Sequence, residues 1–210
     1  MKAQSTLISA KDRICDAALQ EFAMRGFDGA NVVRIASEAG VSQPSIHYHF
    51  KSKKALWEAA VTRLRDHLDK GREIVRKQQA GMAPLERLKS SCLLLIEASA
   101  RSPVIGRIIL SEGQTGGERF DWLIRNVLSE HYYDFVEQIE TCIELGLIKA
   151  HRPHHILMLL HGAAVTQFNV APLTSALFGE DCRAPDNVAA FSRLYVDTIF
   201  AGLLAPDKET

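Results

Sequence analysis

Apolar residues recur at three- and four-residue intervals along most of this chain, and this helical period is the feature that most limits its fold. In KDRICDAALQEFAMRG, Ile14, Ala18 and Phe22 follow one another at steps of four, so they share one face of a helix. Strand-like alternation is scarce, and glycines and prolines divide the pattern into segments. The sequence therefore predicts an all-α protein of about nine helices with no confident strand.

Residues with known start and stop preferences place the first three helices. We expect Gly26 to end the first helix and Asn31 to cap the second, because the Asn31 side-chain oxygen can accept from first-turn N–H groups. Gly40 should stop the second helix and Ser42 should cap the third. Pro44 then falls in the first turn of that helix, where a backbone N–H has no helical partner.

Six further helices are expected in the rest of the chain. They begin near Ser52, Pro84, Pro103, Glu118, Pro153 and Asn187. The helix from Ser52 to about Gln79 carries a stripe that should be buried, formed by Trp57, Val61, Leu64 and Leu68. Residues 118–145 should form one long helix. The stretch APLTSALFGEDCRAPD (171–186) contains two prolines and is expected to be a loop with room for a short helical turn.

Several classes of protein are disfavoured by what the sequence lacks. No apolar run approaches the ~20 residues of a membrane-spanning helix, and MKAQSTLISA lacks the apolar core of a signal peptide. The four cysteines (Cys15, Cys92, Cys142 and Cys182) form no C-x-x-C pair, which disfavours a disulfide scaffold or a zinc ribbon. We therefore expect a cytoplasmic protein with no membrane partner.

Charge is distributed unevenly, although the formal net charge is zero. Residues 1–80 contain 14 Lys and Arg against nine Asp and Glu, whereas residues 81–210 contain 11 against 16. A basic first third is what a localised anionic partner would require. Chance scatter also gives an imbalance of this size, so the charge pattern only indicates where to look.

Residues 31–50 have the spacing of two short helices joined by a glycine turn. Ile35 and Ala36 should face inward, and the small Ala36 lets a second helix cross closely. Gly40 permits the tight turn, and Ile46 anchors the second helix to the same small core. This pattern is typical of a helix-turn-helix, whose second helix can enter the major groove of DNA.

The side chains that this arrangement leaves exposed suit bases and phosphates. Gln43 can bond to the edge of an adenine, and the Pro44 ring can pack on a thymine methyl group. The lysines of KSKK supply positive charge for phosphates. By their own chemistry, the candidates for DNA contact are Gln43, Pro44, Ser45, His47, Tyr48, His49, Lys51, Lys53 and Lys54.

Residues 8–68 resemble the DNA-binding domain of the TetR (tetracycline-repressor) family of bacterial transcription regulators. Three stretches carry the resemblance: ALQEFAMRGFDG, RIASEAGVS and HYHFKSKKALWEA. It implies a helix-turn-helix domain over 8–68, with the motif at 31–50, followed by a helical ligand-binding and dimerisation domain over 69–210. It also implies a homodimeric regulator of transcription, expected to be a repressor that a small-molecule ligand releases from a palindromic operator.

The resemblance extends to single residues of the second and third helices. Together with the chemistry above, it gives the expected DNA-contacting set: Asn31, Val33, Ser42, Gln43, Pro44, Ser45, His47, Tyr48, His49, Lys53 and Lys54. The family commonly has Gly and then Leu-Tyr in the recognition helix, where this chain has Pro44, Ile46 and His47. Two assignments of the main phosphate contact therefore stay open, one to His47 and one to Tyr48.

The stretch SEGQTGGERFDWLIRNVLSEHYY combines a glycine-containing loop with aromatic and polar residues, as ligand pockets in helical domains do. The same aromatics could instead fill the core along a long helix. The resemblance implies a cavity for a small molecule in this half of the chain. The expected contacts of that ligand are Cys92, Arg119, Trp122, Arg125, Tyr132 and Phe168.

Small residues in LLHGAAV and FSRLYVDTIFAGLL would let the last two long helices pack closely against other helices. These residues could lie within the core of one subunit. The family resemblance implies instead that they pair with a second subunit in a four-helix bundle. A dimer would also double the few base contacts that one short recognition helix makes.

Other functions receive little support from the sequence. The histidines of HRPHHILMLLH have no acidic or cysteine neighbour, which favours a polar helix start over a metal site. The motifs G-x-S-x-G, H-E-x-x-H and G-x-G-x-x-G are absent, so we expect neither an enzyme nor a cofactor. A DNA-binding protein with no effector, a helical enzyme and a protein-interaction module remain as alternatives.

Overall fold

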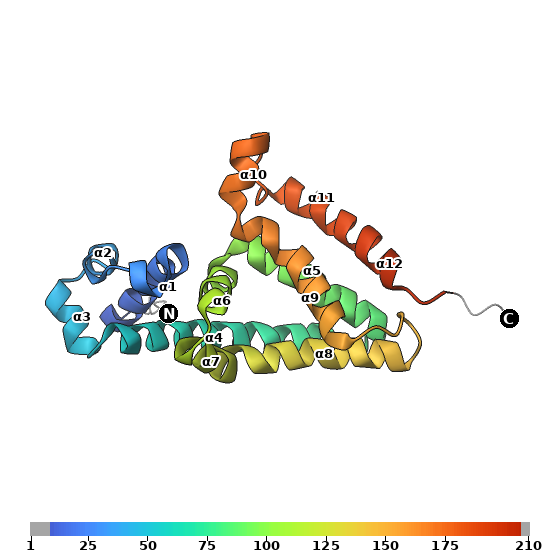
Figure 1. The fold of residues 1–210 in the computed structure, drawn as a ribbon, viewed down its shortest axis with the longest axis horizontal. Coiled ribbons are helices and arrows are strands. Elements are labelled where there is room, and N and C mark those ends of the chain that lie inside the picture. The colour runs from blue at the N-terminus through green and yellow to red at the C-terminus, as the bar shows by residue number, and fades with distance from the viewer. Residues whose placement is uncertain (1–8, 207–210) are drawn as a thin grey trace, which may run out of the picture. The chain divides into compact units, whose positions relative to one another are not determined.

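The computed structural model describes residues 9–206, apart from the side chain of His67. Within that range the chain is helical and contains no strand, only an isolated bridge between Ile148 and Leu204 (Figure 1). The α-helices are α1 (Ala10–Gly29), α2 (Val32–Glu38), α3 (Gln43–His49), α4 (Lys53–Gln78), α5 (Pro84–Arg101), α6 (Val104–Thr115), α7 (Glu118–Leu123), α8 (Ser129–Glu144), α9 (Pro153–Asn169), α10 (Ala171–Phe178), α11 (Pro185–Tyr195) and α12 (Ala201–Leu203). The predicted all-α fold is confirmed.

The stretch predicted to be a loop with a short helical turn is more helical than expected in its first half. Residues 171–178 form α10, which ends at Gly179 with φ 70°. Pro172 lies in the first turn of α10, where a proline starts a helix rather than breaking it. The same argument correctly places Pro44 in the first turn of α3.

The long helix predicted from Glu118 to Leu145 is present but contains a π-helical turn, η1 (Ile124–Leu128), between α7 and α8. A second π-turn, η2 (Val196–Phe200), joins α11 to α12. Such turns disturb the regular i to i+4 bonding. At η1 the Asn126 side chain donates to the Trp122 carbonyl at 2.8 Å, which satisfies one backbone oxygen there.

The described residues form two compact units. The first contains residues 9–72 and 107–127, and the second contains 73–106 and 128–206. Helix α7 and most of α6 thus pack with the N-terminal helices, whereas the sequence suggested one boundary after residue 68. The functional division into domains 8–68 and 69–210 stays a prediction, and residues 8 and 207–210 lie outside the described range.

The first unit is built around the apolar faces of α1 to α4. Phe22, Ile35, Ile46 and Trp57 are buried there, with Trp122 of α7 packed edge-on against Trp57 at 5.5 Å between ring centroids. This core fixes the angle at which α2 and α3 leave α1.

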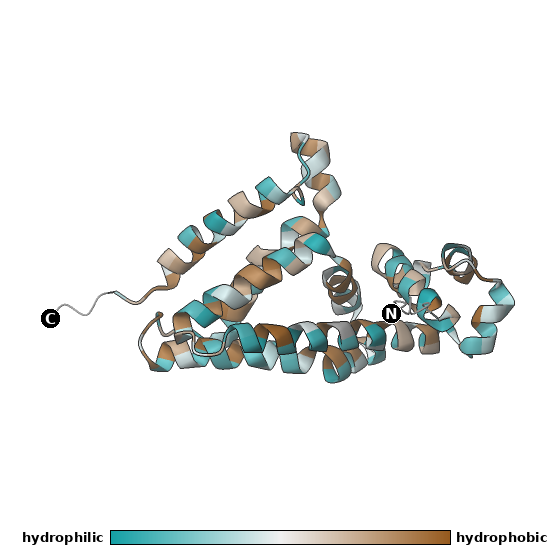
Figure 2. Ribbon diagram, turned by 180° about the vertical axis from the view of Figure 1, so that it is seen from behind, coloured by the Kyte–Doolittle hydropathy of each residue, from teal (hydrophilic) through white to brown (hydrophobic). Residues whose placement is uncertain are grey.

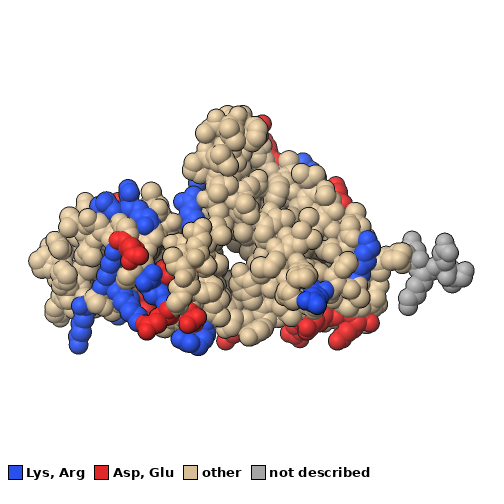
Figure 3. All heavy atoms as spheres, viewed as in Figure 1, with Lys and Arg blue, Asp and Glu red and all other residues tan. Residues whose placement is uncertain are grey.

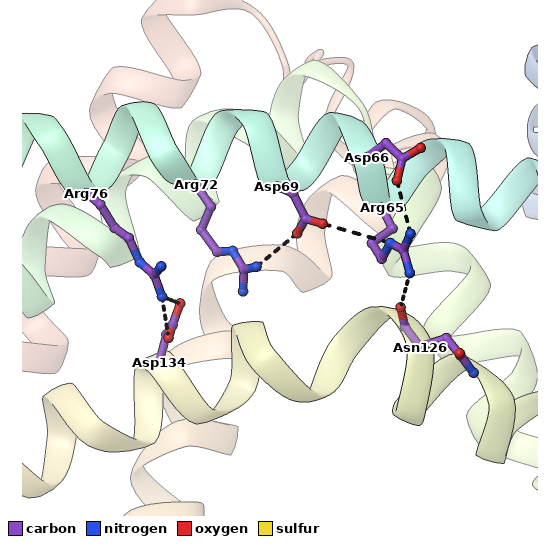
Figure 4. A network of polar contacts seen from close by, with 7 residues as sticks. All are labelled: Arg65, Asp66, Asp69, Arg72, Arg76, Asn126 and Asp134. Atoms are coloured by element: carbon purple, nitrogen blue, oxygen red, sulfur yellow. Dashed lines mark hydrogen bonds and ion pairs between the residues drawn. The ribbon is translucent and has the colours of Figure 1, made fainter.

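Helix α4 follows its predicted stripe only in part. Trp57 and Val61 are buried and Leu64 is half-buried, but Leu68 is exposed, so the stripe ends earlier than predicted. After Leu64, α4 makes polar contacts within the first unit. Arg65 donates to the Asn126 carbonyl at 3.3 Å, next to an ion pair between Asp69 and Arg72 (Figure 4).

The second unit has a larger apolar core between α5, α8, α9 and α11. Its fully or nearly fully buried side chains include Leu88, Cys92, Ile96, Phe135, Ile139, Leu160, Phe168, Tyr195 and Phe200. Each of these helices carries both hydrophobic and hydrophilic residues (Figure 2). At the end of α4, Arg76 donates to both carboxylate oxygens of Asp134 at 3.0 Å (Figure 4).

Within the described range, no single helix is both long and apolar enough to cross a membrane. Only α9 and α10 taken together reach the required length and composition, and they are bent by 63° relative to each other.

Candidate nucleic-acid interface

The helix-turn-helix at residues 31–50 is held by its caps. Asn31 accepts from the Val33 N–H at 2.7 Å, as predicted for the start of α2. At the other end, the Gly40 N–H donates to the Ser37 carbonyl and the Val41 N–H donates to the Ala36 carbonyl. This pair of bonds is the Schellman motif, which needs the positive φ of 62° at Gly40. The turn between α2 and α3 is therefore fixed by backbone geometry.

Buried residues on α2 and α3 decide which face of α3 is free. Ile35, Ala36, Ile46 and Phe50 are all buried, as the sequence predicted for the first three. Ser42 occupies the position before α3, but its side chain makes no capping bond. With Ile46 turned inward, the neighbouring positions of α3 face solvent.

The predicted DNA-contacting residues of α3 lie on or beside this free face. Ser42, Gln43, Pro44, His47 and Tyr48 are exposed, and Ser45 and His49 are half-buried. Tyr48 is 86% exposed and lies edge-on to His49, with ring centroids 5.2 Å apart. A tyrosine so exposed gains little from the core of its own chain, and amphipathic aromatic residues are enriched where they contact partners.

Val33 and Asn31, the predicted DNA contacts at the start of α2, differ in the contacts that they make within the protein. Val33 is exposed, which leaves its side chain available at the edge of the interface. Asn31 has a structural role, because its oxygen caps α2 and its N–H donates to Glu21 at 3.0 Å. Arg34 also donates to Glu21. Burial would raise the pKa of Glu21, but the bonds from Arg34 and Asn31 outweigh it and lower that pKa.

Both predicted lysines at the start of α4 have partners within the first unit. Lys53 donates to the Asp28 carbonyl at 3.1 Å, and its Nζ lies 5.1 Å from the centroid of the Phe27 ring. Lys54 forms an ion pair with Glu118 at 3.3 Å. Figure 3 shows Lys and Arg side chains gathered over this unit, with acidic side chains among them. The sequence did not reveal these internal contacts, since their partners lie far along the chain.

Comparisons with known proteins agree with this geometry. The family described as bacterial regulatory proteins, tetR family, matches residues 14–60, which include all of α2 and α3. Over a longer span the chain is 27% identical to the HTH-type transcriptional regulator RutR of Escherichia coli (strain K12), across 186 residues that cover 86% of this chain and 84% of RutR. The DNA-binding region of the chain is therefore similar to that of the TetR family.

The chain shows two further similarities. It is 37% identical over 59 residues, 28% of its length and 32% of the relative's, to the biofilm operon icaADBC HTH-type negative transcriptional regulator IcaR of Staphylococcus aureus (strain Newman). It also shares the fold of the transcriptional regulator FadR from Bacillus subtilis, solved in complex with stearoyl-CoA, with a TM-score of 0.67 and 17% identity over 90% of this chain and 97% of FadR. These relatives are transcription regulators, and the TetR family is not a family of enzymes, as predicted.

The predicted effector contacts are divided between the two units. Arg119, Trp122 and Arg125 belong to the first unit, and only Arg125 is exposed. Cys92, Tyr132 and Phe168 belong to the second unit. Cys92 and Phe168 are fully buried in its core, where burial raises the pKa of the Cys92 thiol to about 12. Within a single unit, therefore, no more than three of the six are brought together.

One polar residue in the core of the second unit was not predicted as a contact. His161 is 8% exposed, and its ring centroid lies 5.0 Å from that of Tyr132 and 4.6 Å from that of Phe135. Its Nε2 is buried with no hydrogen-bond partner. Burial, together with His131 nearby, lowers the pKa of His161 to about 3. The sequence showed only a histidine on an apolar helix, and its depth depends on how α8 packs against α9.

The other histidines of this stretch lie at the surface. His151 and His155 line a hollow of about 330 Å³ together with residues of η2 and α12. In the part of the chain that the structure describes, no group of three or more His, Cys, Asp or Glu is placed to hold a metal ion.

Proposed function

We propose that this TetR-family regulator is a homodimeric repressor that binds a palindromic operator through α3 of each protomer. In this proposal α3 lies in the major groove and residues 8–68 form the DNA-binding domain. Residues 69–210 bind a small-molecule effector and form the dimer. Because we propose double-stranded DNA as the partner, we also propose that the protein is cytoplasmic.

The observation that carries the proposal is the free face of α3. A short helix that follows a fixed turn exposes Gln43, Pro44, His47 and Tyr48 together, while Ile46 and Phe50 hold its other face in the core. The major groove admits one helix, and the polar groups of that helix then reach base edges and phosphates. We assign Asn31, Val33, Ser42, Ser45, His49, Lys53 and Lys54 to the edge of the same interface.

Repression and release by an effector rest on relatives. IcaR is named as a negative transcriptional regulator, and FadR was solved with stearoyl-CoA bound. In this chain Tyr132, Phe168 and Cys92 of the second unit, with Arg119, Trp122 and Arg125 of the first, remain the proposed effector contacts. His161 adds a buried polar group beside Tyr132 that a bound molecule could satisfy.

The dimer is supported by apolar side chains that no other part of the described chain covers. Met158 and Leu159 on α9 and Leu194 on α11 are each about half exposed or more. They lie on the two helices that are expected to pair with a second subunit. Exposed apolar patches of this kind often mark protein contacts.

A gel-shift assay with the DNA beside the protein's own gene tests the proposal. Wild-type protein should bind one palindromic segment, and raising the salt concentration should weaken binding steeply. Tyr48→Ala should bind at least about tenfold more weakly, which corresponds to the removal of one good interaction in each half-site. Tyr133→Ala removes an equally prominent tyrosine from α8 of the second unit and should bind like wild type. Equal, salt-indifferent binding by all three proteins would rule the proposal out.

A further inference from the structure

The corner at residues 26–28, near the end of α1, is in close contact with α6. Gly26 interrupts α1 with φ 67° and ψ 175°. A Cβ atom at Gly26 would lie 3.0 Å from the Ser111 hydroxyl of α6, which is closer than such contacts normally are. A side chain at residue 26 would therefore require Ser111 to move, and the positive φ of Gly26 also favours glycine.

Two contacts hold Arg119 of α7 beside this corner, one with Phe27 and one with Glu112. Its guanidinium carbon lies 4.0 Å from the centroid of the Phe27 ring. Its Nε donates to the Glu112 carboxylate, at 3.1 and 3.3 Å to the two oxygens. Glu112 is only 2% exposed, and a buried carboxylate without its partner is costly. Arg119 is thus held in place by the charge and stacking contacts that guanidinium groups favour.

Lys53, at the start of α4, makes contacts with the same corner. Its Nζ lies over the Phe27 ring and donates to the carbonyl of Asp28, the next residue. Phe27 also stacks on Phe22 of α1, with ring centroids 5.8 Å apart and the planes nearly parallel. One aromatic ring therefore contacts a cation from α7, a cation from α4 and the core of α1.

We propose that Arg119 is a positioning residue for DNA binding. Arg119, anchored by Glu112, holds Phe27 and the corner at residues 26–28, and this corner sets the place of Lys53 beside α3. The proposal assigns to Arg119 a supporting role at the interface that the sequence did not predict. It rests on the proposed function, because positioning Lys53 matters only if Lys53 faces a phosphate.

The test compares operator binding by the effector-free full-length protein and its variants. Arg119→Gln and Phe27→Leu should each weaken operator binding about tenfold, since both release Lys53 from the corner. The double variant should be little weaker than either single variant, because the two changes break one chain of contacts. Arg119→Lys should fall between wild type and Arg119→Gln, since lysine keeps the charge but not the planar group. Arg101→Gln, at an exposed arginine of the second unit, is the control.

The salt dependence separates positioning from simple destabilisation. The slope of log affinity against log salt should become shallower by about 0.9 for each phosphate that the protein no longer neutralises. Phe27→Leu changes no charge. Its slope of log affinity against log salt should nevertheless approach that of a Lys53→Gln variant, in which the Lys53 charge is removed. A variant that merely unfolds part of the protein would lose affinity with an unchanged slope.

The outcomes are distinct for the two proposals. If wild type binds the operator but Arg119→Gln and Phe27→Leu keep its affinity and slope, the positioning role is overturned. If Arg119→Gln fails to fold, Phe27→Leu alone decides, because it leaves the ion pair with Glu112 intact. If wild type itself shows no preference for the operator, the proposed function is overturned instead.

Discussion

The two units of the chain keep their most informative polar residues in opposite environments. In the first unit Tyr48 is 86% exposed on a short helix, and its neighbours on the free face are polar. In the second unit His161 is 8% exposed among aromatic rings, with an unpaired nitrogen. The first arrangement suits a large partner that docks from outside. The second suits a group that is kept neutral inside a core.

This difference separates residues that matter for binding from residues that matter for stability. The exposed Tyr48 side chain contributes little to the stability of the fold, so its replacement should affect DNA binding and leave the fold intact. The apolar residues around His161 form the core of the second unit. Changing a residue in one unit while both units are observed tests this contrast. Both tryptophans, Trp57 and Trp122, lie in the first unit, so their fluorescence reports on that unit alone.

The largest expected effect is in the core of the second unit. Ile139→Ala should reduce the free energy of unfolding by about 2–5 kcal/mol, since it removes buried methyl groups and leaves a cavity. Leu145→Ala, at an exposed leucine just after the same helix, should change it by less than about 0.5 kcal/mol. Urea unfolding followed by far-UV circular dichroism measures both. Similar losses for the two variants would show that the core is misplaced.

The pH dependence of stability should also differ between the units. Folded His161 stays neutral because its pKa is lowered from 6.5 to about 3, so below pH 6.5 the unfolded chain binds a proton that the folded chain does not. Stability of the second unit should then fall by about 1.4 kcal/mol per pH unit as the pH drops from 6.5 toward 3. In the first unit the lowered pKa of Glu21 contributes stability that is lost only as the pH falls below 4.5.

Hydrogen exchange of the amides of α9 between pH 4.5 and 6.5 measures this window in the second unit. His161→Phe keeps an aromatic ring in the cluster and should remove most of the pH dependence. His154→Phe, at an exposed histidine of the same helix, should leave it unchanged. A wild-type protein whose α9 protection stays constant from pH 6.5 to 4.5 would contradict the buried, neutral histidine.

The smallest effect concerns the two caps of the helix-turn-helix. Asn31→Ala should destabilise the first unit by about 1 kcal/mol, because Asn31 accepts the Val33 N–H at the start of α2. Ser42→Ala should cost less, because the Ser42 side chain makes no capping bond. Tryptophan fluorescence during urea unfolding compares the two variants. A larger loss for Ser42→Ala would reverse the assigned roles of the caps.

Much of the first unit could be predicted from the sequence, because its determinants lie close together along the chain. Gly40, Asn31 and Ile46 fall within sixteen consecutive residues, and each acts on its immediate neighbours through a cap, a turn or one helix face. The contacts of Lys53 and Arg119 could not be read in this way. They depend on α6 and α7 returning to the corner at residues 26–28, which no local pattern encodes.

The candidate effector contacts show the same limit. The sequence pattern placed aromatic and polar residues together along 111–133, but the structure divides the predicted contacts between two units. The depth of His161 follows from the packing of α8 against α9 and was not visible in an otherwise apolar helix. The extent of α10 was underestimated for a different reason, because its proline was interpreted as part of a loop.

The central claim is that the free face of α3 enters the major groove, and protection of guanine N7 from methylation tests it most directly, since N7 lies in that groove. Wild-type protein should protect guanines in two half-sites about one helical turn apart, ~34–36 Å from centre to centre. Tyr133→Ala should give the same pattern, and Tyr48→Ala should lose it at equal protein concentration. Operator-bound wild-type protein that leaves every guanine N7 reactive, or a Tyr48→Ala variant with unchanged protection, would contradict the account.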